Sequence, residues 1–98
     1  MTGVYVTFQY EGDFDRSRVE QVAQRARSMF EGMPGLQFKF FTFDEKAQRA
    51  VNFYVWEPDG AAEQFFTEEL RERVTTLYGV KPSVNFVEIA QIVDNSRS

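Results

Sequence analysis

Near the middle of the chain, every second side chain carries a hydrogen-bonding group on a compact or apolar body: Asn52, Tyr54 and Trp56. The residues between them are purely apolar. Because side chains of a β-strand alternate between two faces, this pattern predicts a strand over residues 50–56 with two different surfaces. Small-molecule sites are apolar walls with a few placed polar groups, so we expect one surface to line a pocket. The alternative is a protein interface, where Tyr and Trp are also enriched.

The chain contains no histidine and no cysteine. This excludes Ser-His-Asp and Cys-His catalysis, zinc held by His or Cys, and a haem held by a proximal His. A metal site built from carboxylates alone would need a close acidic cluster. The closest acidic pairs, Asp13 with Asp15 and Glu68 with Glu69, fall at helix beginnings or on solvated helix faces. We therefore expect no metal site.

The composition is that of one small folded domain, residues 1–98, with 43% hydrophobic residues. The net charge is −4 and the lysines and arginines form no dense cluster, so nucleic acid is a poor partner. No apolar run is long enough to cross a membrane, and the N-terminus lacks the regions of a signal peptide. We expect a cytoplasmic protein that binds neither nucleic acid nor membrane.

Apolar periodicity predicts the order of elements. Strands are expected over residues 4–10, 36–43, 50–56 and 83–94. An amphipathic helix capped by Asp13 or Asp15 lies between the first two strands, and its apolar positions run from Val19 to Phe30. A second helical stretch is expected over residues 60–79, with Asp59 as its cap. It forms either one helix or two helices in tandem. Twelve residues are long for a strand, so 83–94 contains a bulge or a tail that pairs with another chain.

This order, strand–helix–strand–strand–helix–strand, predicts an α+β, ferredoxin-like βαββαβ fold with a four-stranded antiparallel sheet. Right-handed crossovers place both helices on one side of the sheet. We expect one aromatic-rich set of side chains on the uncovered side: Tyr5, Thr7, Gln9, Lys39, Phe41, Phe43, Asn52, Tyr54 and Trp56. Because so many aromatic rings would not stay in water, we expect a two-fold homodimer whose sheets meet and enclose a cavity.

Two motifs resemble a known family. Residues Pro34–Thr42, followed by Glu45-Lys46 and Phe53–Trp56, resemble the YdhR-like mono-oxygenases over nearly the whole chain. More broadly, the segment Phe53–Glu57 leading into a helix is similar to the antibiotic-biosynthesis mono-oxygenase superfamily. The resemblance implies a dimeric α/β barrel.

In the superfamily's anthrone-type oxygenases, an Asn and a Trp four residues apart line the substrate pocket, and the reaction needs neither metal nor flavin. Asn52 and Trp56 match that spacing, so the resemblance implies a cofactor-independent reaction. The chain departs from the haem-degrading branch, because the haem-ligating His of that branch cannot exist here.

The candidate catalytic residues are Asn52, Trp56 and Lys39. Amide and indole N–H groups can donate to a substrate oxygen, and a buried Lys can act as base or as counter-ion to an enolate. Alternatively, Lys39 extends to the rim and Tyr54 merely fills an interface. The candidate substrate-binding residues on the same surface are Thr7, Gln9, Phe41 and Tyr54.

Three functions fit these residues. The first is a cofactor-independent mono-oxygenase acting on a small aromatic or polyketide-like substrate in a dimer-enclosed pocket. The second is an isomerase or cyclase that polarises an enol in the same pocket. The third is a non-catalytic dimer that binds a small apolar molecule.

Overall fold

The computed structural model describes residues 1–58 and 60–96. The elements follow the predicted order, with the second helical stretch divided in two: β1 (Thr2–Gln9), α1 (Arg16–Phe30), β2 (Leu36–Asp44), β3 (Arg49–Trp56), α2 (Ala61–Phe65), α3 (Glu68–Tyr78) and β4 (Ser83–Glu88). The predicted cap at Asp59 lies outside the described residues. Within the described part of the chain, no helix is long and apolar enough to span a bilayer.

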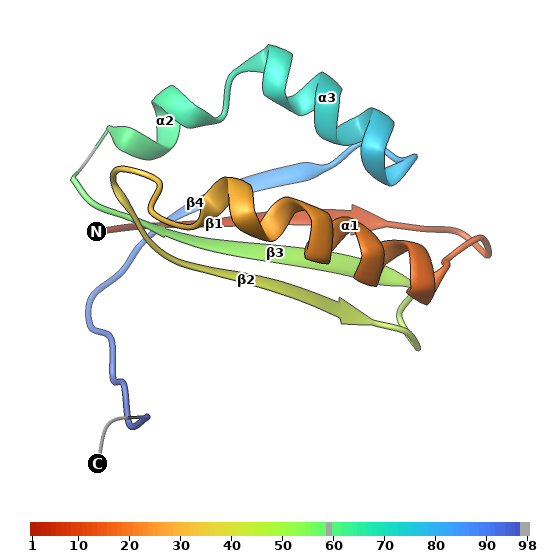
Figure 1. Ribbon diagram of the computed structural model, residues 1–98, viewed down its shortest axis with the longest axis horizontal. Helices are drawn as coiled ribbons and strands as arrows, with labels where there is room; N and C mark the ends of the chain where they lie inside the picture. The colour runs from red at the N-terminus through yellow and green to blue at the C-terminus, as the bar shows by residue number, and fades with distance from the viewer. Residues whose placement is uncertain (59, 97–98) are drawn as a thin grey trace.

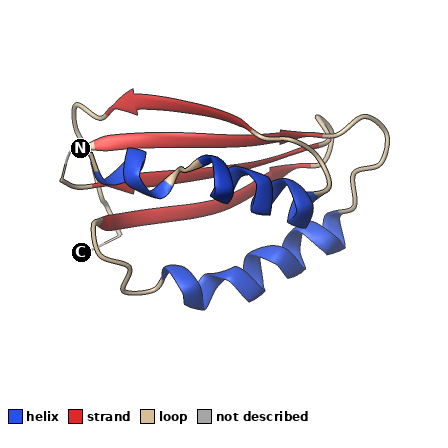
Figure 2. Cartoon of the chain, turned by 90° about the horizontal axis from the view of Figure 1, so that it is seen from above, coloured by secondary structure: helices blue, strands red, loops and turns tan. Residues whose placement is uncertain are grey.

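The strands form one antiparallel sheet in the order β2-β3-β1-β4. All helices lie on one side of it, which leaves the other side open (Figures 1 and 2). This is the predicted ferredoxin-like α+β architecture. The core lies between the sheet and the helices and includes Val4, Val6 and Phe8 of β1.

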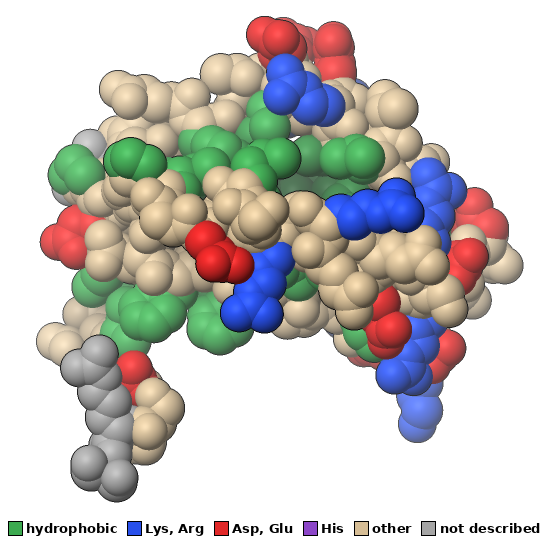
Figure 3. Space-filling model, in the orientation of Figure 1, with side chains coloured by type: hydrophobic (Ala, Val, Ile, Leu, Met, Phe, Trp, Pro, Cys, Tyr) green, Lys and Arg blue, Asp and Glu red, His purple; other side chains and the backbone are tan. Residues whose placement is uncertain are grey.

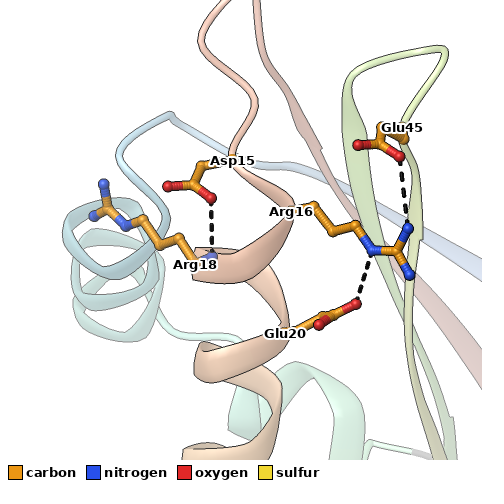
Figure 4. A network of polar contacts seen from close by, with 5 residues as sticks. All are labelled: Asp15, Arg16, Arg18, Glu20 and Glu45. Carbon is orange, nitrogen blue, oxygen red and sulfur yellow. Dashed lines mark hydrogen bonds and ion pairs between the residues drawn. The ribbon is translucent and has the colours of Figure 1, made fainter.

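The first helix begins where the sequence predicts. The Asp15 carboxylate accepts a hydrogen bond from the Arg18 backbone N–H at 3.2 Å, which satisfies one of the free donors of the first turn. Arg16 forms ion pairs with Glu20 at 2.9 Å and with Glu45 of the β2–β3 hairpin at 3.7 Å (Figure 4). These pairs are exposed and add little stability, but they place the start of α1 beside the hairpin.

The second helical stretch divides at Thr67. The Thr67 hydroxyl accepts from the Leu70 backbone N–H at 3.2 Å and so starts a new helix after Phe66. Gly79, in the left-handed conformation, ends α3. The two-helix alternative of the sequence analysis is therefore correct.

The last strand is shorter than predicted. The backbone N–H of Ile89 still donates to the Met1 carbonyl at 3.0 Å, but β1 begins at Thr2, so β4 has no ladder partner beyond this point. The following residues leave the sheet and pass below its open face (Figure 1). The prediction of a strand through residue 94 is therefore wrong.

Candidate functional site

The three alternating side chains of β3 lie under the helices and not on the open face. Asn52 is 4%, Tyr54 4% and Trp56 2% exposed. Asn52 pairs with Val6 and Tyr54 with Val4, and directly opposed residues project to the same side of a sheet. The predicted arrangement, in which this surface meets a second subunit, is therefore wrong. The pocket surface faces the helices of its own chain.

The predicted set of surface residues divides between the two faces. Lys39, Phe41 and Phe43 of β2 pair with Tyr54, Asn52 and Ala50, so they share the helix side. Tyr5 and Thr7 of β1 pair with Phe53 and Val51 and lie on the open side.

Thr7 and Gln9 are therefore separated from the other candidate residues. Gln9 is exposed, and its side-chain amide donates to the carbonyls of Ala47 and Gln48 in the hairpin, at 2.8 and 3.2 Å. Both residues were predicted to bind substrate together with Tyr54, and the register places them on the other side of the sheet.

Lys39 extends inward between aromatic rings. Its Nζ lies 3.4 Å from the ring centre of Phe30 in α1, 4.2 Å from Phe41 and 4.1 Å from Tyr54. It donates a hydrogen bond to the Tyr54 hydroxyl at 2.7 Å. The alternative in which Lys39 extends to the rim is therefore wrong. Burial lowers the pKa of Lys39 to about 6, because the charged amine loses its water.

Asn52 is held by a residue that the sequence analysis did not single out. Its Nδ2 donates to the hydroxyl of Tyr78, the last residue of α3, at 3.1 Å. Tyr78 stacks on Phe8 with ring centres 3.7 Å apart, and its carbonyl accepts from the Tyr10 hydroxyl at 2.7 Å. Burial raises the pKa of Tyr78, and the Asn52 hydrogen bond partly opposes this. Burial likewise raises the pKa of Tyr54, so both phenols stay protonated at neutral pH.

Trp56 lies under α2. Its ring contacts Phe65 and Phe66 with centres 5.0 and 6.3 Å apart, and it stacks on Tyr54 at 6.1 Å. The indole Nε1 is buried and has no hydrogen-bond partner in the described structure. A buried N–H without a partner costs stability, but Trp56 is not among the residues that line the two cavities of this site.

Two adjoining cavities lie between the sheet and the helices and share three lining residues, Phe41, Asn52 and Tyr78. The cavity towards α1 has a volume of about 220 Å³. The cavity between α1 and α3 has about 70 Å³ and is also lined by Lys39 and Tyr54. Figure 3 shows hydrophobic side chains around a hollow between the α2–α3 layer and α1. Small-molecule sites occupy roughly 300–1,000 Å³, so each of these two volumes lies below the usual range.

A wider hollow of about 670 Å³ lies outside α3 and is lined by Glu68, Arg71, Glu72 and Lys81, among others. It contains none of the buried polar groups described above. We therefore place the candidate site in the inner cavities. Among the described residues, no three acidic side chains come close enough to hold a metal ion.

No family model matches the chain, and no curated protein matches it in sequence. Solved structures do match. A monooxygenase from the gene ActVA-Orf6 of Streptomyces coelicolor, in complex with nanaomycin D, superposes with a TM-score of 0.68 at 20% identity, over 97% of this chain and 92% of that one. The chain has the fold of the antibiotic-biosynthesis mono-oxygenases.

Two further structures support the same fold. SnoaB, a cofactor-independent oxygenase from Streptomyces nogalater, matches in a variant form with a TM-score of 0.67 at 16% identity, over 94% of this chain and 95% of that one. Rv0793 from Mycobacterium tuberculosis matches with a TM-score of 0.64 at 15% identity, over 97% and 98%. The ferredoxin-like fold is thus confirmed, whereas the dimer and the narrower YdhR-like resemblance stay predictions.

Sequence reasoning missed Tyr78 and Phe30, which hold Asn52 and Lys39. Each lies on the apolar stripe of a predicted helix, which by itself gives no sign of a role in the site. A signal was present in Tyr78, because a phenol on the buried stripe of a helix needs a hydrogen-bond partner on the facing strand. Asn52 is the buried polar residue of the described core and supplies that partner.

Proposed function

We propose that this protein is a cofactor-independent mono-oxygenase that acts on a small aromatic or polyketide-like substrate. The observation that carries the proposal is the composition of the inner cavities. Apolar and aromatic side chains surround two polar pairs, Lys39 with Tyr54 and Asn52 with Tyr78. A site of this kind can remove one proton from a phenol or enol and hold the resulting anion away from water.

The reaction balances without an added reductant. A ring methylene activated by a neighbouring phenol or enol gives up a proton, and the resulting carbanion reduces dioxygen. One oxygen atom replaces the two methylene hydrogens as a new carbonyl. The other oxygen atom leaves as water with those hydrogens, so the substrate supplies all the electrons.

Lys39 is the proposed base. Because burial lowers the pKa of Lys39 to about 6, its amine is mainly neutral at pH 7 and can accept the substrate proton. Asn52 is the proposed donor to the substrate oxygen, because it lines both cavities. The Trp56 indole N–H has no partner in the described structure, but Trp56 lines neither cavity, so it has no direct contact with the substrate in this proposal. Phe41 and Tyr54 provide ring surfaces for an aromatic substrate.

The homodimer belongs to the same proposal and again joins two open sheet faces, but the side chains that meet are not those of Asn52, Tyr54 and Trp56. Large apolar side chains there are well exposed, with Tyr5 at 42%, Phe38 at 40%, Phe40 at 52% and Val87 at 40%. A contiguous apolar patch of this kind favours association. We propose that two subunits pack open face to open face while each keeps its own pocket.

Oxygen uptake with a panel of phenols and anthrones tests the activity. The wild-type protein should consume one dioxygen per product, and the rate should fall by at least about 100-fold in Lys39→Met, the loss of a general base. Thr76→Ala, which changes an exposed hydroxyl on α3, serves as the control. Product formed at full rate under strict anaerobiosis would instead favour the isomerase or cyclase. Binding without turnover of any substrate would leave only the ligand-binding alternative.

A further inference from the structure

Lys39 has the surroundings of a reactive amine. Its Nζ lies among the rings of Phe30, Phe41 and Tyr54, and in the described part of the chain no carboxylate lies within ion-pair distance of it. Its hydrogen-bond partner is the Tyr54 hydroxyl at 2.7 Å. An amine in such a place keeps an unshared electron pair, because neither water nor a carboxylate stabilises its protonated form.

Two effects act on this amine in opposite directions. Burial lowers the pKa of Lys39 to about 6. The three ring faces favour the ammonium form, but such contacts contribute less than the cost of removing the charge from water. The neutral amine therefore predominates near pH 7.

A hollow that is open to solvent lies beside the Lys39 side chain. Lys39 lines the inner cavity and also an outer hollow of about 280 Å³ between the end of α1 and β2. Arg27 and Glu31 line the outer hollow, and Arg73 and Tyr78 line the inner cavity. Arg27 pairs with Glu31 at 3.3 Å and Arg73 with Glu69 at 3.5 Å, so these charges are largely balanced at the rim.

We propose that Lys39 condenses with small, uncharged aldehydes or ketones that enter through the outer hollow and forms an imine with them. An apolar cavity admits an uncharged aromatic carbonyl compound, and a neutral amine is the nucleophile that such a compound requires. Imine formation consumes no dioxygen, so this activity goes beyond the proposed oxygenase and does not depend on it.

The step balances in atoms and electrons. The Lys39 nitrogen attacks the carbonyl carbon, a C–N bond forms, and the carbonyl π electrons move to oxygen. The Tyr54 hydroxyl gives a proton to that oxygen and regains one from the nitrogen. The C–O bond then breaks, water leaves with the second nitrogen proton, and the nitrogen electron pair forms the C=N bond. Tyr54 suits this exchange because it already contacts Nζ and burial keeps it protonated.

The chain contains its own controls, because it has three lysines, Lys39, Lys46 and Lys81. Lys46 and Lys81 are exposed. The protein is incubated with benzaldehyde and sodium cyanoborohydride near pH 7, and the sites of benzylation are mapped by peptide mass spectrometry. We expect Lys39 to be benzylated at least about tenfold faster than Lys46 and Lys81, since a protonated amine cannot attack.

Two variants separate reactivity from mere exposure. Lys39→Met should leave the slow labelling of the two exposed lysines unchanged and remove the fast site. Tyr54→Phe should keep Lys39 reactive but slow its benzylation by about 100-fold, the lower limit of what a positioned proton donor contributes. Equal rates at all three lysines, or a Lys39 that stays unlabelled in the folded wild-type protein, would overturn the proposal. The mapping uses the wild-type chain, so it decides the question even if a variant fails to fold.

Discussion

Asn52 is the buried polar residue around which the site is organised. Its amide holds the Tyr78 hydroxyl, and Tyr78 connects α3 to β1 through the Phe8 ring and the Tyr10 hydroxyl. One strand residue thus joins the sheet to the last turn of a helix. A polar pair buried in this way specifies one arrangement of helix on sheet, because any shift leaves both groups without partners.

We expect Asn52 and Tyr78 to be coupled in stability. Asn52→Ala leaves a buried hydroxyl without its donor and should cost about 1–3 kcal/mol of unfolding free energy. In combination with Tyr78→Phe the loss should be smaller than the sum of the two single changes, by about 1 kcal/mol. Urea unfolding of the four proteins measures this coupling. A second cycle with Gln21→Ala, at an exposed position of α1, should be additive. Additivity in the Asn52 cycle as well would contradict the pairing.

Lys39 should make stability depend on pH. The folded-state pKa of Lys39, about 6, lies below the 10.4 of an exposed lysine, so between these values the unfolded chain binds the extra proton. Stability due to this group is therefore lost as the pH falls from about 10 to about 6, by up to about 1.4 kcal/mol per pH unit. Lys39→Met should be more stable than the wild type at pH 7, and its advantage should shrink towards pH 9. A constant difference in urea unfolding across this range would contradict a neutral Lys39.

The alternation along β3 was predictable from the sequence, but the side that the helices cover was not. Val51, Phe53 and Val55 are more apolar than their neighbours, which by itself favours the core for their side of the strand. In the structure Phe53 and Val51 pair with Tyr5 and Thr7 on the open face. Because a shift of one residue in register exchanges the two faces, hydrophobicity alone does not decide between them. The deciding fact is a distant partner, the Tyr78 hydroxyl, which a local pattern cannot show.

At the scale of the elements, the sequence predicts the features that depend on neighbouring residues. These are the order of the elements, the cap at Asp15 and the possible division of the second helical stretch. The end of β4 was not, because it depends on where β1 begins. The connection between α1 and β2 is another non-local feature. The Gly35 carbonyl accepts from the Glu57 backbone N–H at 2.8 Å, which ties this turn to the end of β3 above Trp56.

Replacing Gly35 tests how closely these elements pack. Gly35 has φ +85, and a Cβ there would lie 3.2 Å from the Glu57 carbonyl oxygen and 3.4 Å from the Ala61 Cβ. Gly12 has φ +90 and nothing within 4 Å, so it is the matched control for the backbone strain alone. We expect Gly12→Ala to cost about 1 kcal/mol and Gly35→Ala about 1 kcal/mol more. Thermal or urea unfolding measures the loss of unfolding free energy in both variants. Equal losses would show that the turn at Gly35 accommodates a Cβ without a steric clash.

For the whole molecule, we expect the open sheet face to decide the oligomeric state. Phe40 is the most exposed of its aromatic side chains, at 52%. Phe40→Lys places a charge in the proposed interface and should convert a dimer into a monomer of 11.4 kDa at micromolar concentration, as measured by light scattering. Gln21→Lys adds the same charge on exposed α1 and should stay dimeric. A wild-type protein that is already monomeric would remove the dimer from the proposal.

The location of the cavities has a consequence for how such an assembly would work. The residues that line the inner cavity all belong to one chain. Strands β2 and β3 form one side of the cavity, and helices α1 and α3 form the other. Each protomer then contains all the residues that line its inner cavity. Dimerisation would bury the apolar open face and would add no residue to the site. If an inactive variant is mixed with wild-type chains, the turnover rate should accordingly fall in proportion to the fraction of wild-type chains. The inactive subunit should neither restore nor inhibit the activity of its partner.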